Sequence, residues 1–199
     1  MHSTCPLLSS VLLIAASACT AVHAERAIPA SELFDRMRGM WLGQLIGNAA
    51  GRDTEGDDSS SSLPPADSVP WQIQLGSDAD DDTDVEYVAL HTLFNHGFEC
   101  NATEITGRWL EHMSADGIYV ANRQAWHLML DGLQPPETGS RRYNEHWYSI
   151  DSQICTEILG TVSPGLPQAA IDLVGRFGRI TNEGFALHAA QFYAAMHAQ

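Results

Sequence analysis

Lysine is absent from this chain of 199 residues, and its ten arginines face 25 aspartates and glutamates, which leaves a formal net charge of −15 at pH 7. Binding to a nucleic-acid backbone depends on basic side chains that neutralise phosphates, so no nucleic-acid partner is expected. Without lysine, a Schiff-base lysine and the lysine of a phosphate-binding P-loop are also excluded. A glycine-rich phosphate cradle of the G-x-G-x-x-G type is missing as well.

Acidic and basic side chains are both missing from residues 1–24, apart from histidine. This segment holds an apolar stretch from Val11 to Ala18, followed by small residues three before and immediately before a cut after Ala24, which is the pattern of a secretory signal peptide. We expect a signal peptide over 1–24, a mature domain over 25–199, and export to the periplasm or the cell exterior. The apolar stretch is too short to cross a bilayer, so no membrane span is expected.

Cysteine is scarce, with four residues in the chain. Cys19 ends the stretch Ala16-Ser17-Ala18-Cys19, which is loosely similar to a bacterial lipoprotein cleavage box, and lipidation there is the less favoured alternative to ordinary cleavage. After cleavage at residue 24 only Cys100 and Cys155 remain. Export permits a disulfide between them, but the sequence leaves their pairing open. Two cysteines without close histidine partners make no convincing zinc site.

Helical periodicity runs through the mature chain, and no segment shows sustained alternation of period two. The fold class is therefore predicted to be all-α, in one domain of ordinary size. No repeat of fixed period is evident, so a helical solenoid is not expected. A long polar loop is expected over 52–70. The helices are expected over 31–47, from 81 onwards, and over 103–113, 118–130, 150–159, 167–177 and 183–197.

Glycines recur every four residues along the first expected helix, at Gly39, Gly43, Gly47 and Gly51. In a membrane helix such a ridge is a dimerisation face. Charged neighbours exclude that interpretation here, so we expect tight helix packing inside a soluble core.

The run Asp80-Asp81-Asp82-Thr83-Asp84 packs four carboxylates into five residues, directly before an apolar helical pattern. Carboxylates that crowded repel one another unless a cation lies among them, and Mg²⁺ takes oxygen ligands of this kind. The alternative is an acidic helix cap that complements the helix dipole, although one or two aspartates would suffice for that. The run by itself leaves both interpretations open.

Two other metal motifs fit the run less well. An EF-hand needs Gly at the sixth loop position and Glu at the twelfth, and no register of this run supplies them. The spacing Asp80-Asp81-x-x-Asp84 resembles the aspartate-rich motif of Mg²⁺-dependent terpene synthases and prenyltransferases. Those enzymes need a second metal motif, which is not found, so this interpretation remains a minor alternative.

Two stretches, taken together, resemble the ADP-ribosylglycohydrolase family. Residues 35–56, D-R-M-R-G-M-W-L-G-Q-L-I-G-N-A-A-G-R-D-T-E-G, are similar to the family's opening helix and the glutamate-bearing loop that follows it. Residues 80–87, D-D-D-T-D-V-E-Y, are similar to its T-D-D-T metal motif. Residues 150–153 and 164–167 are similar to a bacterial subgroup. The resemblance extends from Asp35 to the end of the chain.

The resemblance implies an all-α, orthogonal multi-helix bundle with two Mg²⁺ ions in a cleft. It implies a hydrolase that cleaves the glycosidic bond of ADP-ribose adducts, with an ADP-ribose-containing small molecule or an ADP-ribosylated protein as partner. By position, it assigns Asp81 and Asp82 as metal ligands and puts Asp80 where the family often has a threonine ligand. It also assigns Glu55 as a carboxylate that contacts metal and substrate, Glu55 and Asp82 as the catalytic acids, and Asp151 and Asn48 to the substrate side.

The chain also departs from the family pattern. Asn48 stands where the family usually has Asp, and no D-x-D-[ST] motif follows Asp84 to supply further metal ligands. We therefore expect an N-terminal portion of a larger protein or a truncated paralogue, with a bundle incomplete at its C-terminus and weak metal binding. A second hypothesis is a non-catalytic exported helical domain that binds an ADP-ribose-like ligand or none. In that case Glu55 is a solvated loop acid.

Overall fold

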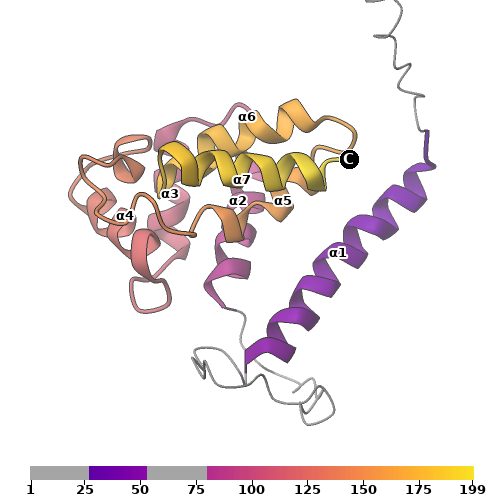
Figure 1. The fold of residues 1–199 in the computed structure, drawn as a ribbon, viewed down its shortest axis with the longest axis horizontal. Helices are drawn as coiled ribbons and strands as arrows, with labels where there is room; N and C mark the ends of the chain where they lie inside the picture. Colours follow the sequence, from indigo (N-terminus) through magenta and orange to yellow (C-terminus); the bar gives the residue numbers. More distant parts are fainter. Residues whose placement is uncertain (1–26, 53–79) are drawn as a thin grey trace, which may run out of the picture. The chain divides into compact units, whose positions relative to one another are not determined.

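The structure, a computed structural model, describes residues 27–52 and 80–199. Within these ranges the regular secondary structure consists of α-helices and 3₁₀ turns, and no strand forms. This confirms the all-α prediction. The predicted signal peptide and most of the polar loop, including Glu55, lie outside the described residues. The helices are α1 (Ala30–Gly51), α2 (Asp81–His96), α3 (Ala102–His112), α4 (Val120–Leu130), α5 (Glu157–Thr161), α6 (Pro167–Phe177) and α7 (Gly184–His197) (Figure 1).

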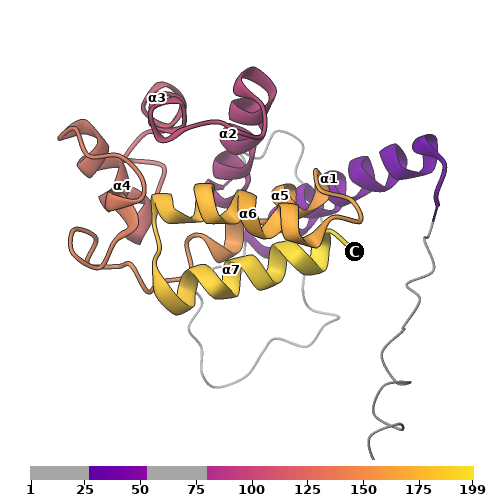
Figure 2. The same ribbon diagram turned by 90° about the horizontal axis from the view of Figure 1, so that it is seen from above.

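Contacts divide the chain into a unit over 1–36 and a unit over 37–199, and α2 to α7 belong to the second. There α7 packs along α6 and α5, while α2 packs against α3 and α5. Figure 2 shows α6 and α7 lying side by side. Glycine permits the close packing of α5 on α7, because a Cβ at Gly160 of α5 would lie 2.5 Å from the backbone oxygen of Ala194 in α7. Any larger residue at position 160 would therefore push the two helices apart.

The apolar face predicted for α2 is the buried face, with Val85, Val88, Ala89 and Leu93 in the core and Thr92 fully covered. Spacing of three and four residues is what places these side chains on one side of a helix. Pro167 occupies the first turn of α6, where its missing N–H has no helical partner to lose. Six of the expected helices are confirmed to within a few residues.

The helix predicted over 150–159 is wrong, because the segment breaks into a 3₁₀ turn, Gln153–Cys155, and the short α5. The backbone N–H of Ile158 explains the break. In a continuous helix it would bond to the carbonyl four residues earlier, but here it donates to the Glu86 carboxylate at 2.9 Å. A side chain from α2 thus ends one helical turn and starts the next.

The glycine ridge of α1 also differs from expectation. The helix has no buried residue, and a Cβ added at Gly39, Gly43, Gly47 or Gly51 would meet no described atom within 4 Å. The ridge is open because no described segment approaches it.

Cys100 and Cys155 are both buried and free, so the pairing that the sequence left open is not formed. In the described part of the chain, none of the helices combines the length and apolar character that a bilayer crossing requires.

Candidate metal centre

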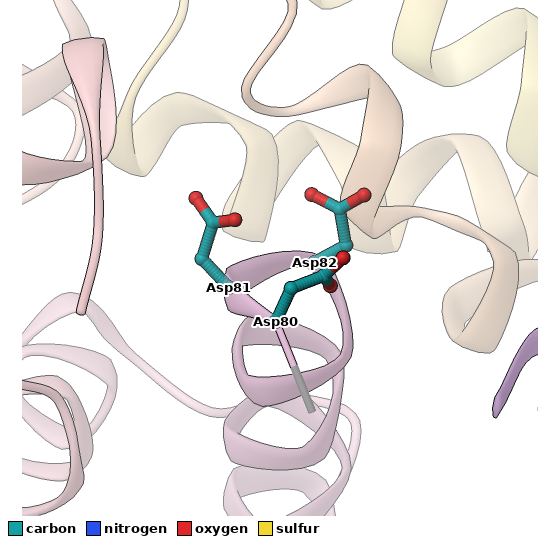
Figure 3. A group of neighbouring side chains, drawn as sticks. All are labelled: Asp80, Asp81 and Asp82. Atoms are coloured by element: carbon teal, nitrogen blue, oxygen red, sulfur yellow. The ribbon is translucent and has the colours of Figure 1, made fainter. Parts of the chain in front are cut away.

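The acidic run lies at the N-terminal end of α2. Asp80 occupies the position before the helix with an extended backbone (φ −96°, ψ −179°), and Asp81 and Asp82 stand in the first turn. One carboxylate oxygen from each of the three half-buried side chains lies within 4.8 Å of the others. Figure 3 shows the three carboxylates leaving the same turn of the helix. Among the described residues no other group of three aspartates, glutamates, histidines or cysteines converges in this way.

Asp80 is in the capping position but does not cap the helix, since its side chain accepts no hydrogen bond from the first-turn amides of α2. The N-terminus of α3 shows what a cap looks like in this chain. There Asn101 accepts from the Glu104 N–H at 3.1 Å, and the Glu104 carboxylate accepts from the Asn101 N–H at 2.8 Å. The cap hypothesis therefore fails for Asp80, although the acids of the first turn still lie at the positive end of the helix dipole.

One oxygen of Asp80 lacks a partner. The Asn48 amide donates to Oδ2 of Asp80, which brings together two of the predicted site residues. The other oxygen, Oδ1, is buried and has no hydrogen-bond donor among the described residues. The Thr83 hydroxyl is also buried and has no hydrogen-bond partner among them. A buried carboxylate oxygen without a donor is costly, by about 1–3 kcal/mol or more. A cation beside Asp80 would remove that penalty.

The spacing of the three carboxylates suits Mg²⁺. The ion binds oxygens at about 2.1 Å, so two ligands on opposite sides of it lie about 4.2 Å apart. The observed separations of up to 4.8 Å require only a small inward movement of the side chains. The donor set, carboxylate oxygens with a nearby hydroxyl, is the one that hard divalent cations select. The residues present therefore fit the metal that the resemblance implies.

Negative charge extends from the cluster toward the Gln153–Cys155 turn. Burial, and then the charge of Asp80, raise the pKa of Asp84. Burial raises the pKa of the Cys155 thiol well above its usual value, with further contributions from the acids Asp82, Glu86, Asp81 and Glu157. Cys155 consequently remains a protonated thiol at neutral pH.

Glu86 is a residue of this region that sequence reasoning missed. It stands one helical turn after Asp82 and is completely buried. Its Oε1 accepts from the Ile158 N–H at 2.9 Å, and its Oε2 accepts from the Gln44 amide at 2.6 Å. Burial raises the pKa of Glu86 to about 7, the Glu157 carboxylate contributes in the same direction, and the two hydrogen bonds oppose the shift. An acid within the apolar face of a helix was the signal in the sequence.

Asp151, predicted at the substrate side, has a packing role in the structure. It is 5% exposed and accepts from the Asn122 N–H at 2.9 Å and from the Ser149 hydroxyl. Asn122 is in the first turn of α4, whose own preceding residue, Tyr119, supplies no cap. Asp151 therefore caps α4 from a distant position in the sequence. It also lines a cavity of about 20 Å³ behind α2. Its substrate role stays a prediction.

Comparison with known proteins gives one match, to a protein family. A family model described as ADP-ribosylglycohydrolase matches residues 29–199. The matched range includes both stretches that carried the resemblance, which is thereby confirmed. A search of curated proteins and a search of solved structures each found no significant match.

Proposed function

Since the chain belongs to the ADP-ribosylglycohydrolase family, we propose that it is a Mg²⁺-dependent hydrolase that cleaves the glycosidic bond of ADP-ribose adducts, with its metal centre at the start of α2. The observation that carries the proposal is the convergence of Asp80, Asp81 and Asp82, together with the buried, donorless Oδ1 of Asp80. Family membership gives a glycohydrolase-like enzyme. The metal and the site residues are our proposal.

The residues have separate tasks in this proposal. Asp80, Asp81 and Asp82 hold Mg²⁺, and the resemblance assigns Glu55, which lies outside the described residues, as a further carboxylate of the site. When bound, Mg²⁺ would supply Lewis-acid activation of a water and offset the pyrophosphate charge of the substrate. Glycoside cleavage passes through an oxocarbenium-like state, which the carboxylates Asp82 and Glu55 stabilise from beside the bond. Asn48 orients Asp80 through its amide.

The full family site is expected to hold two ions, and its substrate is an ADP-ribose-containing small molecule or an ADP-ribosylated protein. With a signal peptide over 1–24, that substrate would be met outside the cytoplasm. One observation favours a second candidate, a non-catalytic domain that binds ADP-ribose or nothing. Outside the run at 80–82, the described residues hold no second group of metal-ligating side chains.

Calorimetric titration of the full chain with Mg²⁺, and then with ADP-ribose in its presence, tests the proposal. We expect saturable Mg²⁺ binding and ADP-ribose binding that depends on it. Asp81→Asn/Asp82→Asn should abolish both, whereas the matched control Asp116→Asn, which changes an exposed and isolated acid, should leave both intact. Wild-type binding without metal dependence would overturn the proposal.

A release assay on peptides ADP-ribosylated through arginine and, separately, through serine then separates the two candidates. The hydrolase releases free ADP-ribose in a Mg²⁺-dependent reaction that the double variant loses. Metal-dependent binding without release would identify the non-catalytic domain instead.

A further inference from the structure

A cavity of about 610 Å³ shares no lining residue with the acidic run. It is formed by the start of α3, the loop at Pro135 and Pro136, the second half of α6, and Gln191 of α7. α2, which has 16 residues and is about 24 Å long, lies in sequence between the acidic run and Glu99, the first of the lining residues. The volume is in the usual range for small-molecule sites, which are mostly apolar with a few polar groups.

The floor of this cavity is apolar. Ile105 and Cys100 are buried in the core beneath it, and Ile171, Pro135 and Pro136 complete the surface that a ligand would contact. A hydrocarbon group placed there loses its contact with water, which is favourable by roughly 25 cal/mol per Å².

Two arginines, Arg176 and Arg179, line the cavity. Arg176 donates from Nη1 to the Phe98 carbonyl at 2.8 Å and from Nη2 to the Glu99 carboxylate at 2.5 Å. The Phe98 bond holds Arg176 in place independently of Glu99, whose side chain is 88% exposed. Arg179, three residues further on, forms no ion pair within 4.0 Å in the described part of the chain, and its charge acts on Glu183 only at longer range.

The N-terminus of α3 adds to the positive character of the cavity. The Asn101–Glu104 cap satisfies the N–H groups of those two residues, while the amides of Ala102 and Thr103 have no intrahelical partner. Ala102 itself lines the cavity. Among the lining acids, Asp172 accepts a hydrogen bond from Gln168 at 3.0 Å, and Glu99 occupies Arg176.

We propose that this cavity binds a small organic carboxylate, with its apolar part on the floor and its carboxylate between Arg176 and Arg179. The Glu99 carboxylate already shows how such a group meets Arg176, because a guanidinium pairs with a carboxylate through directed hydrogen bonds. The ligand displaces Glu99 into solvent and gains Arg179 as a second partner. The site is independent of the metal centre and of the proposed hydrolase activity.

Titration of the full chain with hexanoate tests this site, with binding detected by calorimetry or by NMR of the ligand. We expect saturable binding of hexanoate that is tighter than that of acetate, hexanol or inorganic phosphate. Arg179→Ala should weaken hexanoate binding by about tenfold, as expected for the loss of a charged hydrogen bond. Ala102→Trp should fill the cavity and abolish binding, and Glu99→Gln should tighten binding because it removes the competing carboxylate.

Two controls isolate the site. Arg142→Ala removes a cation that lies over the Tyr143 ring and does not line the cavity, and it should leave hexanoate binding unchanged. Asp81→Asn/Asp82→Asn should leave it unchanged as well, so failure of the metal centre would not affect this result. The proposal is overturned if the wild type shows no saturable hexanoate binding, if binding survives both Arg179→Ala and Ala102→Trp, or if inorganic phosphate binds as tightly as hexanoate.

Discussion

The first turns of α2 and α3 are both rich in oxygen-bearing side chains, and they use them in opposite ways. At α3 the Asn101 and Glu104 side chains are consumed by reciprocal hydrogen bonds to the backbone. At α2 four aspartates share one turn, and Asp80, in the capping position, bonds to Asn48 and leaves one oxygen without a donor. The comparison separates an acid that caps a helix, Glu104, from Asp80, whose buried Oδ1 has no hydrogen-bond donor in the described part of the chain. In the proposed hydrolase, a metal ion is the partner of that oxygen.

Glu86 gives the largest expected effect on stability. It is completely buried behind the α2 acids, whereas Glu104 of α3 is partly exposed. Its pKa is raised from 4.5 to about 7, so the folded protein binds this proton more tightly than the unfolded chain. Its contribution to the free energy of unfolding is complete below about pH 4.5 and is lost as pH rises through about 7. At 1.36 kcal/mol per pKa unit, that contribution is on the order of 3 kcal/mol.

Urea unfolding at several pH values from 4.5 to 8 measures the slope of the free energy of unfolding against pH. Glu86→Gln should flatten this slope. The glutamine remains neutral, keeps its acceptor for the Ile158 N–H, and can donate to the unpartnered Oε1 of Gln44 once that amide turns. An unchanged slope in Glu86→Gln would show that the pH dependence has another origin.

Asp151→Ala should lower the free energy of unfolding by about 2 kcal/mol, because it leaves the Asn122 N–H at the start of α4 buried without an acceptor. Asp151→Asn retains an acceptor oxygen and should recover most of that loss. Denaturant titration of both variants measures the difference. Equal stability of wild type and Asp151→Ala would refute the capping role.

Asn101→Ala should lower the free energy of unfolding by about 1 kcal/mol, the usual loss for an N-cap. The change removes the acceptor for the Glu104 N–H. Asn101→Asp is the matched variant, since it retains the acceptor and should be neutral. Thermal unfolding compares the three proteins, and a destabilised Asn101→Asp would indicate that the cap is not what Asn101 provides.

Asp80→Asn gives the smallest effect and the opposite sign. In metal-free buffer it should raise the free energy of unfolding by about 0.5 kcal/mol, because it removes the charge that faces Asp84 without removing the acceptor for Asn48. The gain should shrink as salt screens the repulsion. Thermal unfolding in chelator at low and high salt measures it. A loss of stability would mean that Asp80 supports α2 as an ordinary cap does.

Features that depend on neighbours in the sequence could be predicted, and features that depend on distant segments could not. The buried face of α2 follows from its spacing, and the start of α6 follows from Pro167. The acidic cluster was found for the same reason, since its members are consecutive. The break before α5 was missed because Glu86 causes it from 72 positions away.

The capping of α4 by Asp151 and the open glycine ridge of α1 were missed for a related reason. Both depend on which segments approach in three dimensions, and a spacing pattern carries no information about that. Family resemblance assigned Asp151 to the substrate side, which stays a prediction, and gave no sign of the helix cap that its hydrogen bonds show.

The central claim is that the aspartates at the start of α2 hold a divalent metal ion. Titration of the full chain with Mn²⁺ tests it most directly, with the free ion detected by its electron paramagnetic resonance signal. Wild type should bind Mn²⁺ in competition with Mg²⁺. Asp80→Asn should weaken that binding by at least about tenfold, since even partners behind a metal ligand affect affinity by that much. Equal Mn²⁺ affinities for wild type and Asp80→Asn, with Asp116→Asn as the reference, would contradict the account.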